Sequence, residues 1–223
     1  MKKYAVIVAG GSGQRMGVAT PKQFLLLNGK PLLWYSVRAF LSSFDDISII
    51  LVLPSNNRAE GESIVAGLDA AARVTITEGG ATRFHSVQNG LALVKEPSVV
   101  FVHDGVRCLV TSALINRCYN QALEKGSAIP AVAATDSIRI VDGDNHTVAN
   151  RSYVRIIQTP QTFRSEIILP AYDTPYNDSF TDEATVAEAA GHKVFLVDGE
   201  HENIKITRPV DLLVAERILK DRL

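Results

Sequence analysis

Apolar, β-branched runs alternate with amphipathic helical patterns along most of this chain. Strands are expected at residues 4–9, 47–53, 74–77, 99–103, 128–132 and 193–197. Helices are expected at residues 31–41, 57–71, 83–94, 112–124, 182–190 and 210–220. This order is typical of a mostly parallel sheet with helices on both faces. We therefore expect an α/β fold whose ligand crevice lies beyond the carboxyl ends of the strands.

One stretch interrupts the alternation. Residues 137–141 alternate between apolar and polar side chains, residues 142–145 form a turn cluster, and residues 147–149 and 154–157 are again extended in pattern. The pattern predicts a β-hairpin inserted into the α/β fold. Because an isolated hairpin is only marginally stable in water, it needs a surface to pack on. That surface is either a partner subunit or the hairpin's own domain, and the pattern favours neither.

Composition narrows the class of protein. The chain has 223 residues with 23 basic and 24 acidic side chains, a size that fits one domain and a balance that gives no nucleic-acid footprint. No run approaches about 18 consecutive apolar residues, and the N-terminus lacks the apolar core of a signal peptide. We therefore expect no nucleic acid and no membrane among the partners, and a cytoplasmic location. The five histidines and two cysteines lack zinc-ligand spacing.

The first expected strand leads into a glycine-rich loop that carries cations. Residues 9–17 read Ala-Gly-Gly-Ser-Gly-Gln-Arg-Met-Gly, and Pro21-Lys22-Gln23 follows. Glycines let the backbone approach a phosphate, while Arg15 and Lys22 add positive charge. The spacing matches neither a P-loop nor a dinucleotide fingerprint, because Lys22 follows a proline and Gly17 comes one residue late. The loop indicates a nucleoside triphosphate site; the alternative is a tight turn with solvated charges.

Three further segments are expected near the same crevice. They are residues 79–83 with Ser86 one turn later, residues 103–107 at the end of the most apolar strand, and residues 203–207 before the last helix. Taken singly, the glycine pair at 79–80 could be a turn, Asp104 a cap and Lys205 a solvated edge residue. Their joint occurrence, in this order on this fold, is far more specific.

In combination, these motifs make the chain resemble the 2-C-methyl-D-erythritol 4-phosphate cytidylyltransferases of the non-mevalonate isoprenoid pathway. The resemblance covers essentially the whole chain and rests on residues 9–16, 21–23, 79–80 with Arg83 and Ser86, 103–104 with Arg107, 158–161, 181–184 and 203–209. It implies a Rossmann-like nucleotidyltransferase domain over residues 1–223, and a homodimer formed through the hairpin arm at about residues 136–157. The implied reaction joins CTP to methylerythritol phosphate, releases pyrophosphate and uses Mg²⁺, whose direct ligands the sequence does not identify.

The resemblance also implies roles for single residues. The implied catalytic residues are Arg15, Lys22 and Lys205. The implied nucleotide contacts are Ala9, Gly10, Gly11, Gly13, Arg15, Lys22, Gly80, Ala81, Ser86, Asp104, Gly105 and Lys205. The implied contacts to the polyol phosphate are Asp104, Arg107 and Thr159, with Ser137 and Arg151 supplied by the partner's arm.

The chain departs from the family pattern at three positions. Ala81 stands where an Asp often follows the glycine pair, Ser137 replaces a Thr, and Cys108 stands where Pro is common. The change at Ala81 puts one nucleotide contact in doubt, while Ser137 keeps the hydroxyl group.

Other functions remain as alternatives. A ribitol 5-phosphate cytidylyltransferase shares the fold and CTP, although the pattern of residues 181–188 favours the isoprenoid enzymes. A non-catalytic nucleotide-binding module would keep the glycines but need not keep Arg15, Lys22 and Lys205 together. An oxidoreductase is disfavoured by the glycine spacing.

Overall fold

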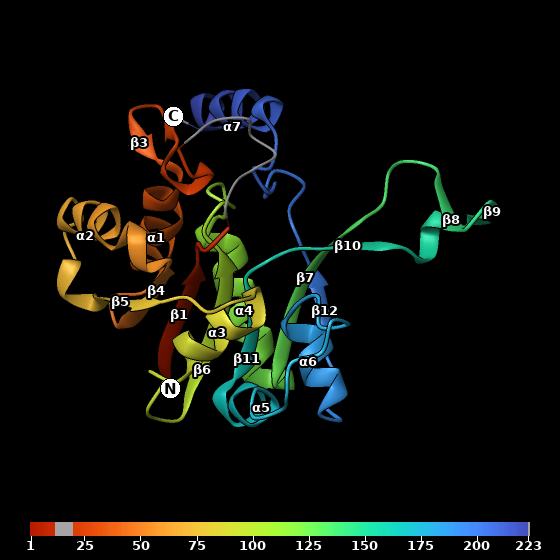
Figure 1. Cartoon of the computed structure of the whole chain (residues 1–223), viewed down its shortest axis with the longest axis horizontal. Helices are drawn as coiled ribbons and strands as arrows, with labels where there is room; N and C mark the ends of the chain where they lie inside the picture. Colours follow the sequence, from red (N-terminus) through yellow and green to blue (C-terminus); the bar gives the residue numbers. More distant parts are fainter. Residues whose placement is uncertain (12–19, 223) are drawn as a thin grey trace.

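A computed structural model describes residues 1–11 and 20–222, and within them eight strands form one sheet (Figure 1). The strand order is β10-β7-β11-β6-β1-β4-β5, with β12 beside β7. The strands are β1 (Lys2–Val8), β4 (Ile47–Leu53), β5 (Val74–Glu78), β6 (Ser98–Asp104), β7 (Ser127–Ala133), β10 (Arg155–Ile157), β11 (Gln161–Arg164) and β12 (Leu196–Asp198). β1, β4, β5 and β6 are parallel neighbours, so their carboxyl ends meet at one edge. The expected α/β fold with a mostly parallel core is confirmed.

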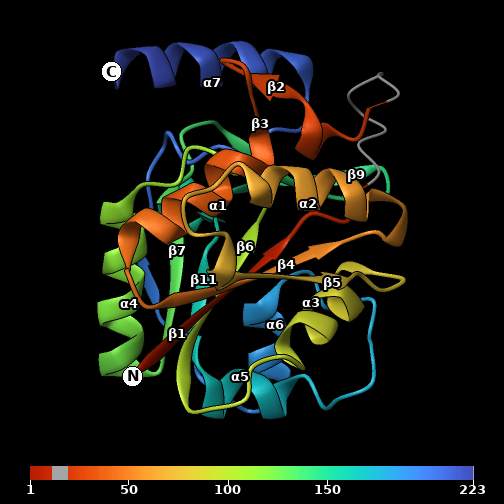
Figure 2. The same cartoon turned by 90° about the vertical axis from the view of Figure 1, so that its left-hand side faces the viewer.

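Helices cover both faces of this sheet, and Figure 2 shows the two groups on opposite sides. One face carries α1 (Leu32–Ser43), α2 (Arg58–Ala66) and α4 (Ser112–Lys125), and the other carries α3 (Arg83–Leu91), α5 (Ser165–Ala171) and α6 (Glu183–Ala189). The central strand β1 sends Ala5 and Ile7 into the first core and Val6 into the second. Burial on both faces explains why the parallel strands are continuous apolar runs.

A third apolar cluster lies beyond the carboxyl edge of the sheet. There α7 (Pro209–Asp221) covers a short ribbon made of β2 (Leu26–Leu27) and β3 (Lys30–Pro31). Leu27, Ile206 and Ala215 are fully buried in this cluster. The segments that follow the first strand and precede the last helix are therefore packed against each other. The described residues also form single 3₁₀ turns, namely η2 (Lys22–Phe24), η3 (Ser55–Asn57), η4 (Ala71–Arg73) and η5 (Arg151–Tyr153).

Several bounds differ from the sequence expectation. The helix expected at residues 57–71 ends at Ala66, and η4 follows as a separate turn. The strand expected at residues 193–197 is β12, which begins only at Leu196. β11 and α5 were not expected, because β11 has four residues and α5 has seven residues with Pro170 inside. β11 runs antiparallel to both β6 and β7, and β10 runs antiparallel to β7, so these two strands of the sheet oppose the parallel core.

The inserted hairpin is β8 (Ile138–Asp142) paired with β9 (Asn145–Ala149). Gly143 at the turn has a φ of +57°, which glycine adopts at little cost. Residues 154–157 do not belong to the hairpin, because Arg155–Ile157 pairs with β7 in the main sheet as β10. Figure 1 shows β8 and β9 projecting away from the body of the molecule. Their apolar side chains Ile140, Val141 and Val148 are exposed.

No helix of the described residues is both long and apolar enough to cross a membrane.

Candidate functional site

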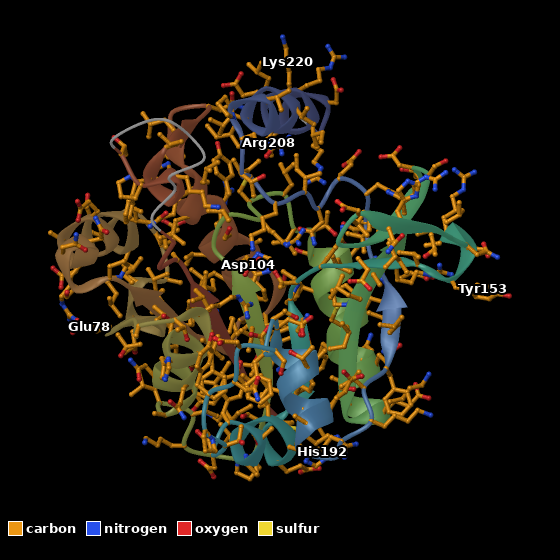
Figure 3. All side chains as sticks on the ribbon, turned by 45° about the vertical axis from the view of Figure 1, so that its right-hand side comes forward. Glu78, Asp104, Tyr153, His192, Arg208 and Lys220 are labelled. Atoms are coloured by element: carbon orange, nitrogen blue, oxygen red, sulfur yellow. The ribbon has the colours of Figure 1, made fainter. Side chains whose placement is uncertain are left out.

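A cavity of about 240 Å³ lies beyond the carboxyl ends of β1, β5 and β6. The expected site residues among those that line it are Ala9, Gly10, Gly11, Lys22, Gly80, Ala81, Ser86, Asp104 and Lys205. Figure 3 shows Asp104 near the middle of the molecule, below Arg208 at the start of α7. Gly13 and Arg15 lie outside the described residues. Segments far apart in the sequence thus meet at the edge where a doubly wound sheet binds its ligands.

Lys22 lies where the N-terminal loop meets the C-terminal segment. It belongs to η2, its residue is 9% exposed, and its Nζ atom donates to the carbonyl oxygen of Ile206 at 3.2 Å. The neighbouring Gln23 donates from Nε2 to the carbonyl oxygen of Ala9 at 2.8 Å. These two bonds fix the ammonium group of Lys22 beside the glycines at the start of the loop.

Asp104, the last residue of β6, is surrounded by cationic side chains. Lys205 Nζ lies 2.9 Å from Oδ2, Arg83 Nη2 lies 3.3 Å from Oδ1, and Arg107 Nε lies 3.7 Å from Oδ2. Burial alone would raise the pKa of the Asp104 carboxyl, but Arg83, Lys205 and Arg107 together hold that pKa far below its usual range. The carboxylate is therefore charged at neutral pH and orients the ammonium group of Lys205.

Behind Asp104, a chain of hydrogen bonds fixes the end of β6. The Asp104 amide donates to Thr159 Oγ1 at 3.0 Å, which lies 3.0 Å from His103 Nδ1. His103 Nε2 lies 3.2 Å from the carbonyl oxygen of Arg107. Burial lowers the pKa of His103 to about 4, so the ring is neutral at neutral pH. In the tautomer that satisfies every contact, Nε2–H donates to the Arg107 carbonyl and Nδ1 accepts from the Thr159 hydroxyl.

The glycine pair before α3 is held by Ser86. Its hydroxyl accepts from the Gly80 amide at 3.0 Å and donates to the Thr82 carbonyl at 2.9 Å. A side chain at Gly80 would place its Cβ 2.4 Å from His85 Cβ, so only glycine fits there. Because the Ser86 hydroxyl is already used within the loop, the backbone around Gly80 and Ala81 is the part that faces a ligand.

The expected contacts to the second substrate fall into three groups. Asp104 lines the cavity, whereas Arg107 and Thr159 lie behind it. Ser137 and Arg151 line a separate surface depression of about 420 Å³ on the arm. Gly105, expected at the nucleotide, bonds through its amide to Val8 and is not among the cavity's lining residues within the part of the chain that the structure describes.

Sequence reasoning assigned no role to two charged residues of the site. Arg83 lines the cavity and contacts both Asp104 and Glu183, the latter with no exposed surface. Arg83 and Glu183 both lie in the motifs that carry the resemblance, and Glu183 falls at the start of the helix expected at residues 182–190. The signal in the sequence is an acidic residue among the apolar side chains that α6 buries.

The donor set at the cavity suits a cation that is bound mainly through phosphates. Within residues 1–11 and 20–222, no group of three or more His, Cys, Asp or Glu side chains is placed to hold a metal ion. Asp104 provides a carboxylate beside the phosphate-binding loop. Mg²⁺ is commonly held by one or two carboxylates together with substrate phosphates and several waters, so this residue set fits that mode of binding.

Comparison with known proteins gives one consistent result. The family model described as 2-C-methyl-D-erythritol 4-phosphate cytidylyltransferase matches residues 4–221. Relatives with that name from Phocaeicola vulgatus and Bacteroides thetaiotaomicron are 42% identical over 219 residues and 43% identical over 220 residues; each match covers 98% of this chain and 100% of the relative.

Two solved structures agree. The chain is similar to the 4-diphosphocytidyl-2C-methyl-D-erythritol synthase of Anaerococcus prevotii, with a TM-score of 0.84, 28% identity and 98% of each chain covered. It is also similar to the 2-C-methyl-D-erythritol 4-phosphate cytidylyltransferase of Thermus thermophilus, with a TM-score of 0.76 and 29% identity over 96% of this chain and 98% of that one.

Proposed function

Because this chain belongs to the 2-C-methyl-D-erythritol 4-phosphate cytidylyltransferase family, we propose that it joins CTP to 2-C-methyl-D-erythritol 4-phosphate in non-mevalonate isoprenoid biosynthesis. An oxygen of the substrate phosphate attacks the α-phosphorus of CTP. The bond from the α-phosphorus to the bridging oxygen breaks, and pyrophosphate leaves. The product is 4-diphosphocytidyl-2-C-methyl-D-erythritol. The observation that carries the proposal is the single cavity in which Lys22 and Lys205 meet the glycine-rich loop.

The chemistry needs positioning and charge more than proton transfer. A phosphate monoester is already anionic at neutral pH, so no general base is required. The site must bring two anions together and stabilise the charge that develops around the α-phosphate. Lys22 is suited to the α-phosphate and the departing pyrophosphate, since its ammonium group is fixed beside the glycine backbone. Arg15, from the same loop, would add a further charge on the triphosphate.

Lys205 is the second catalytic cation of this proposal. Its ammonium group is held at the cavity by Asp104, 2.9 Å away. A phosphate that enters the cavity offers Lys205 a second anionic partner without moving the side chain far. Contacts to a phosphate that strengthen in the transition state raise kcat, whereas uniform contacts only lower KM.

The base of CTP is assigned to the loop before α3. Ser86 holds the Gly80 amide, so the Gly80 carbonyl and the backbone groups of Ala81 remain to read the edge of cytosine. Recognition through the backbone does not require an acidic side chain at position 81, so Ala81 is compatible with this assignment.

The second substrate is assigned to Asp104, supported by Arg107 and Thr159, and to the arm of a second subunit. Ser137 and Arg151 lie on the arm that projects from the body (Figure 1), so a homodimer would bring them to the partner's cavity. The exposed apolar side chains of β8 and β9 support this arrangement, because a hairpin needs a surface to pack on. Arg151 suits the phosphate group, since guanidinium binds it in a bidentate manner.

Mg²⁺ would be held by phosphate oxygens together with Asp104, and would neutralise charge on the triphosphate when bound. A cytoplasmic location stays a prediction from the sequence.

The proposal is tested by pyrophosphate release from CTP and Mg²⁺, with methylerythritol phosphate and ribitol 5-phosphate compared side by side. Release with methylerythritol phosphate alone is expected. Release with ribitol 5-phosphate alone would move the protein to polyol metabolism of the cell envelope, with the same fold and mechanism. Release with neither would favour a non-catalytic nucleotide-binding module.

A further inference from the structure

Glu183 is a buried carboxylate to which the mechanism above gives no role. It opens α6, has no exposed surface, and contacts the Arg83 guanidinium through both of its oxygens. Tyr172 completes its surroundings, with the hydroxyl donating to Oε1 at 3.4 Å. An unpaired carboxylate at this depth would be strongly destabilising, so Glu183 depends on Arg83 for its charge.

Arg83 in turn divides its guanidinium between two carboxylates. Nη1 and Nη2 face Glu183, whereas Nε and Nη2 lie 3.4 and 3.3 Å from Asp104 Oδ1. Burial alone would lower the pKa of Arg83, but the two carboxylates raise it above its ordinary value, so the group stays charged. Both edges of the guanidinium are therefore used within the protein. Although Arg83 lines the cavity, it is engaged as a support for Asp104 and is not available as a bidentate phosphate ligand.

The same helix end is joined to the segment behind Asp104. Gln161 Nε2 donates to the carboxylate of Asp182 at 2.8 Å, and Gln161 Oε1 accepts from the Ala184 amide at 2.8 Å. Two residues before Gln161, Thr159 binds the Asp104 amide. Two sets of contacts thus connect Asp104 to the start of α6. Its carboxylate is held through Arg83 and Glu183, and its backbone through the segment that contains Thr159 and Gln161.

We propose that Glu183 is a positioning residue for the polyol phosphate, acting through Arg83 to fix the carboxylate of Asp104. The inference rests on the proposed function, in which Asp104 contacts the second substrate. Loss of the Glu183 charge frees Arg83 to turn toward Asp104 or the cavity, and the Asp104 carboxylate loses its set position. The backbone at Gly80 and Ala81 that faces the base of CTP is fixed by Ser86 and not by Glu183, so this part of the nucleotide site stays intact.

The first test is Glu183→Gln, which keeps the shape of the side chain and removes its charge. We expect KM for methylerythritol phosphate to rise about tenfold, the cost of weakening one contact to a charged group, and KM for CTP to rise less, since the Asp104 carboxylate meets the triphosphate only through Lys205 and Mg²⁺. Glu188→Gln, on the exposed side of the same helix, is the matched control and should change neither value. Equal rises in both KM values, or no rise in either, would overturn the proposal.

A second variant separates positioning from stability. The pair Arg83→Met with Glu183→Leu replaces the ion pair with apolar groups of similar size, a change that is often neutral or stabilising for a buried pair. We expect the thermal midpoint of this double variant to lie closer to that of the unchanged protein than the midpoint of Glu183→Gln does. Its KM for methylerythritol phosphate should stay about tenfold above that of the unchanged protein. If that KM recovers together with stability, the pair has only a structural role and the proposal fails.

A double-mutant cycle with Asp104→Asn gives the decisive result. If Glu183 acts through Asp104, adding Glu183→Gln to Asp104→Asn raises KM for methylerythritol phosphate no further, whereas independent effects would multiply. A crystal structure of the Glu183→Gln protein supplies a readout that does not depend on the reaction. A displaced Asp104 carboxylate supports the proposal even if the substrate assignment is wrong, and an unmoved carboxylate overturns it even if the assignment is right.

Discussion

The cavity and the hairpin arm both carry polar residues on irregular segments, but they differ in how those residues are held. At the cavity, Asp104 is fixed through side chain and backbone by partners within the same chain. On the arm, Ile140 and Val148 are 62% and 72% exposed, and Tyr153 is 85% exposed and points outward in Figure 3. The difference is what the proposed function expects, in which one chain holds the nucleotide at its own cavity and the arm of a second chain completes the site for the polyol phosphate.

The largest expected effect is the loss of Lys22. Lys22→Ala should lower kcat about 10²–10³-fold, the usual loss for one donor aimed at developing charge, with the fold retained. Steady-state pyrophosphate release measures kcat, and circular dichroism checks the fold. Lys220→Ala, at an exposed position of α7, is the control. A folded Lys22→Ala protein with normal turnover would remove Lys22 from the catalytic role.

The next prediction concerns the buried residues behind Asp104, where the stability of the fold depends on pH. Because the pKa of His103 falls from 6.5 in the unfolded chain to about 4 in the folded protein, the unfolded state binds more protons between these values. The contribution of His103 to the free energy of unfolding should therefore be fully present above pH 6.5. It should decline as pH falls toward 4, by about 3 kcal/mol at most. Urea unfolding at pH 7 and pH 4.5 measures this loss. His103→Asn, which lacks the titrating group, should show a smaller loss between the two pH values; an equal loss would show that other groups dominate.

The arm's contribution to catalysis is tested by Arg151→Ala. We expect KM for methylerythritol phosphate to rise about tenfold or more, with kcat changed less, since one phosphate contact is lost. Mixing this protein with the Lys22→Ala protein should restore activity, because each mixed dimer has one site with both residues intact. At methylerythritol phosphate concentrations well below KM, where Arg151→Ala homodimers turn over slowly, random exchange makes half of the dimers mixed; one of their two sites works, giving about a quarter of the normal activity. Absence of rescue after subunit exchange would argue against a shared site.

The smallest effect on the subunit itself is expected on the arm's apolar surface. Val148→Ser should change the unfolding free energy of a single subunit by less than about 0.5 kcal/mol, because the side chain is exposed within one chain. The same change should shift sedimentation from dimer toward monomer. An unchanged sedimentation profile would show that Val148 does not lie in the subunit interface.

The sequence predicted that residues whose place depends on local position would meet at one cavity. Lys22, Gly80, Asp104 and Lys205 each lie beside the end of a strand or the start of a helix, and parallel strands bring such positions to one edge. The ion pair of Arg83 and Glu183 could not be predicted in the same way. Its members are 100 residues apart, and their contact depends on how α3 and α6 pack on one face of the sheet.

The errors in the predicted fold also arise where the pairing of a segment depends on distant parts of the chain. Residues 154–157 show an extended pattern that fits any neighbouring strand, so the sequence could not distinguish pairing within the hairpin from pairing with β7. β11 was missed because four residues give too short a period to detect, although its place between β6 and β7 decides where Thr159 meets Asp104.

The bond from Lys22 to Ile206 has a consequence for the timing of biosynthesis. The two residues are 184 positions apart, so the lysine meets this carbonyl oxygen only after residue 206 has been synthesised. During translation the emerging N-terminal half can form β1, β4 and β5, yet the phosphate end of its cavity stays open until the segment before α7 leaves the exit tunnel. A nascent chain stalled before residue 206 would lack the carbonyl oxygen that holds the ammonium group of Lys22 at the cavity.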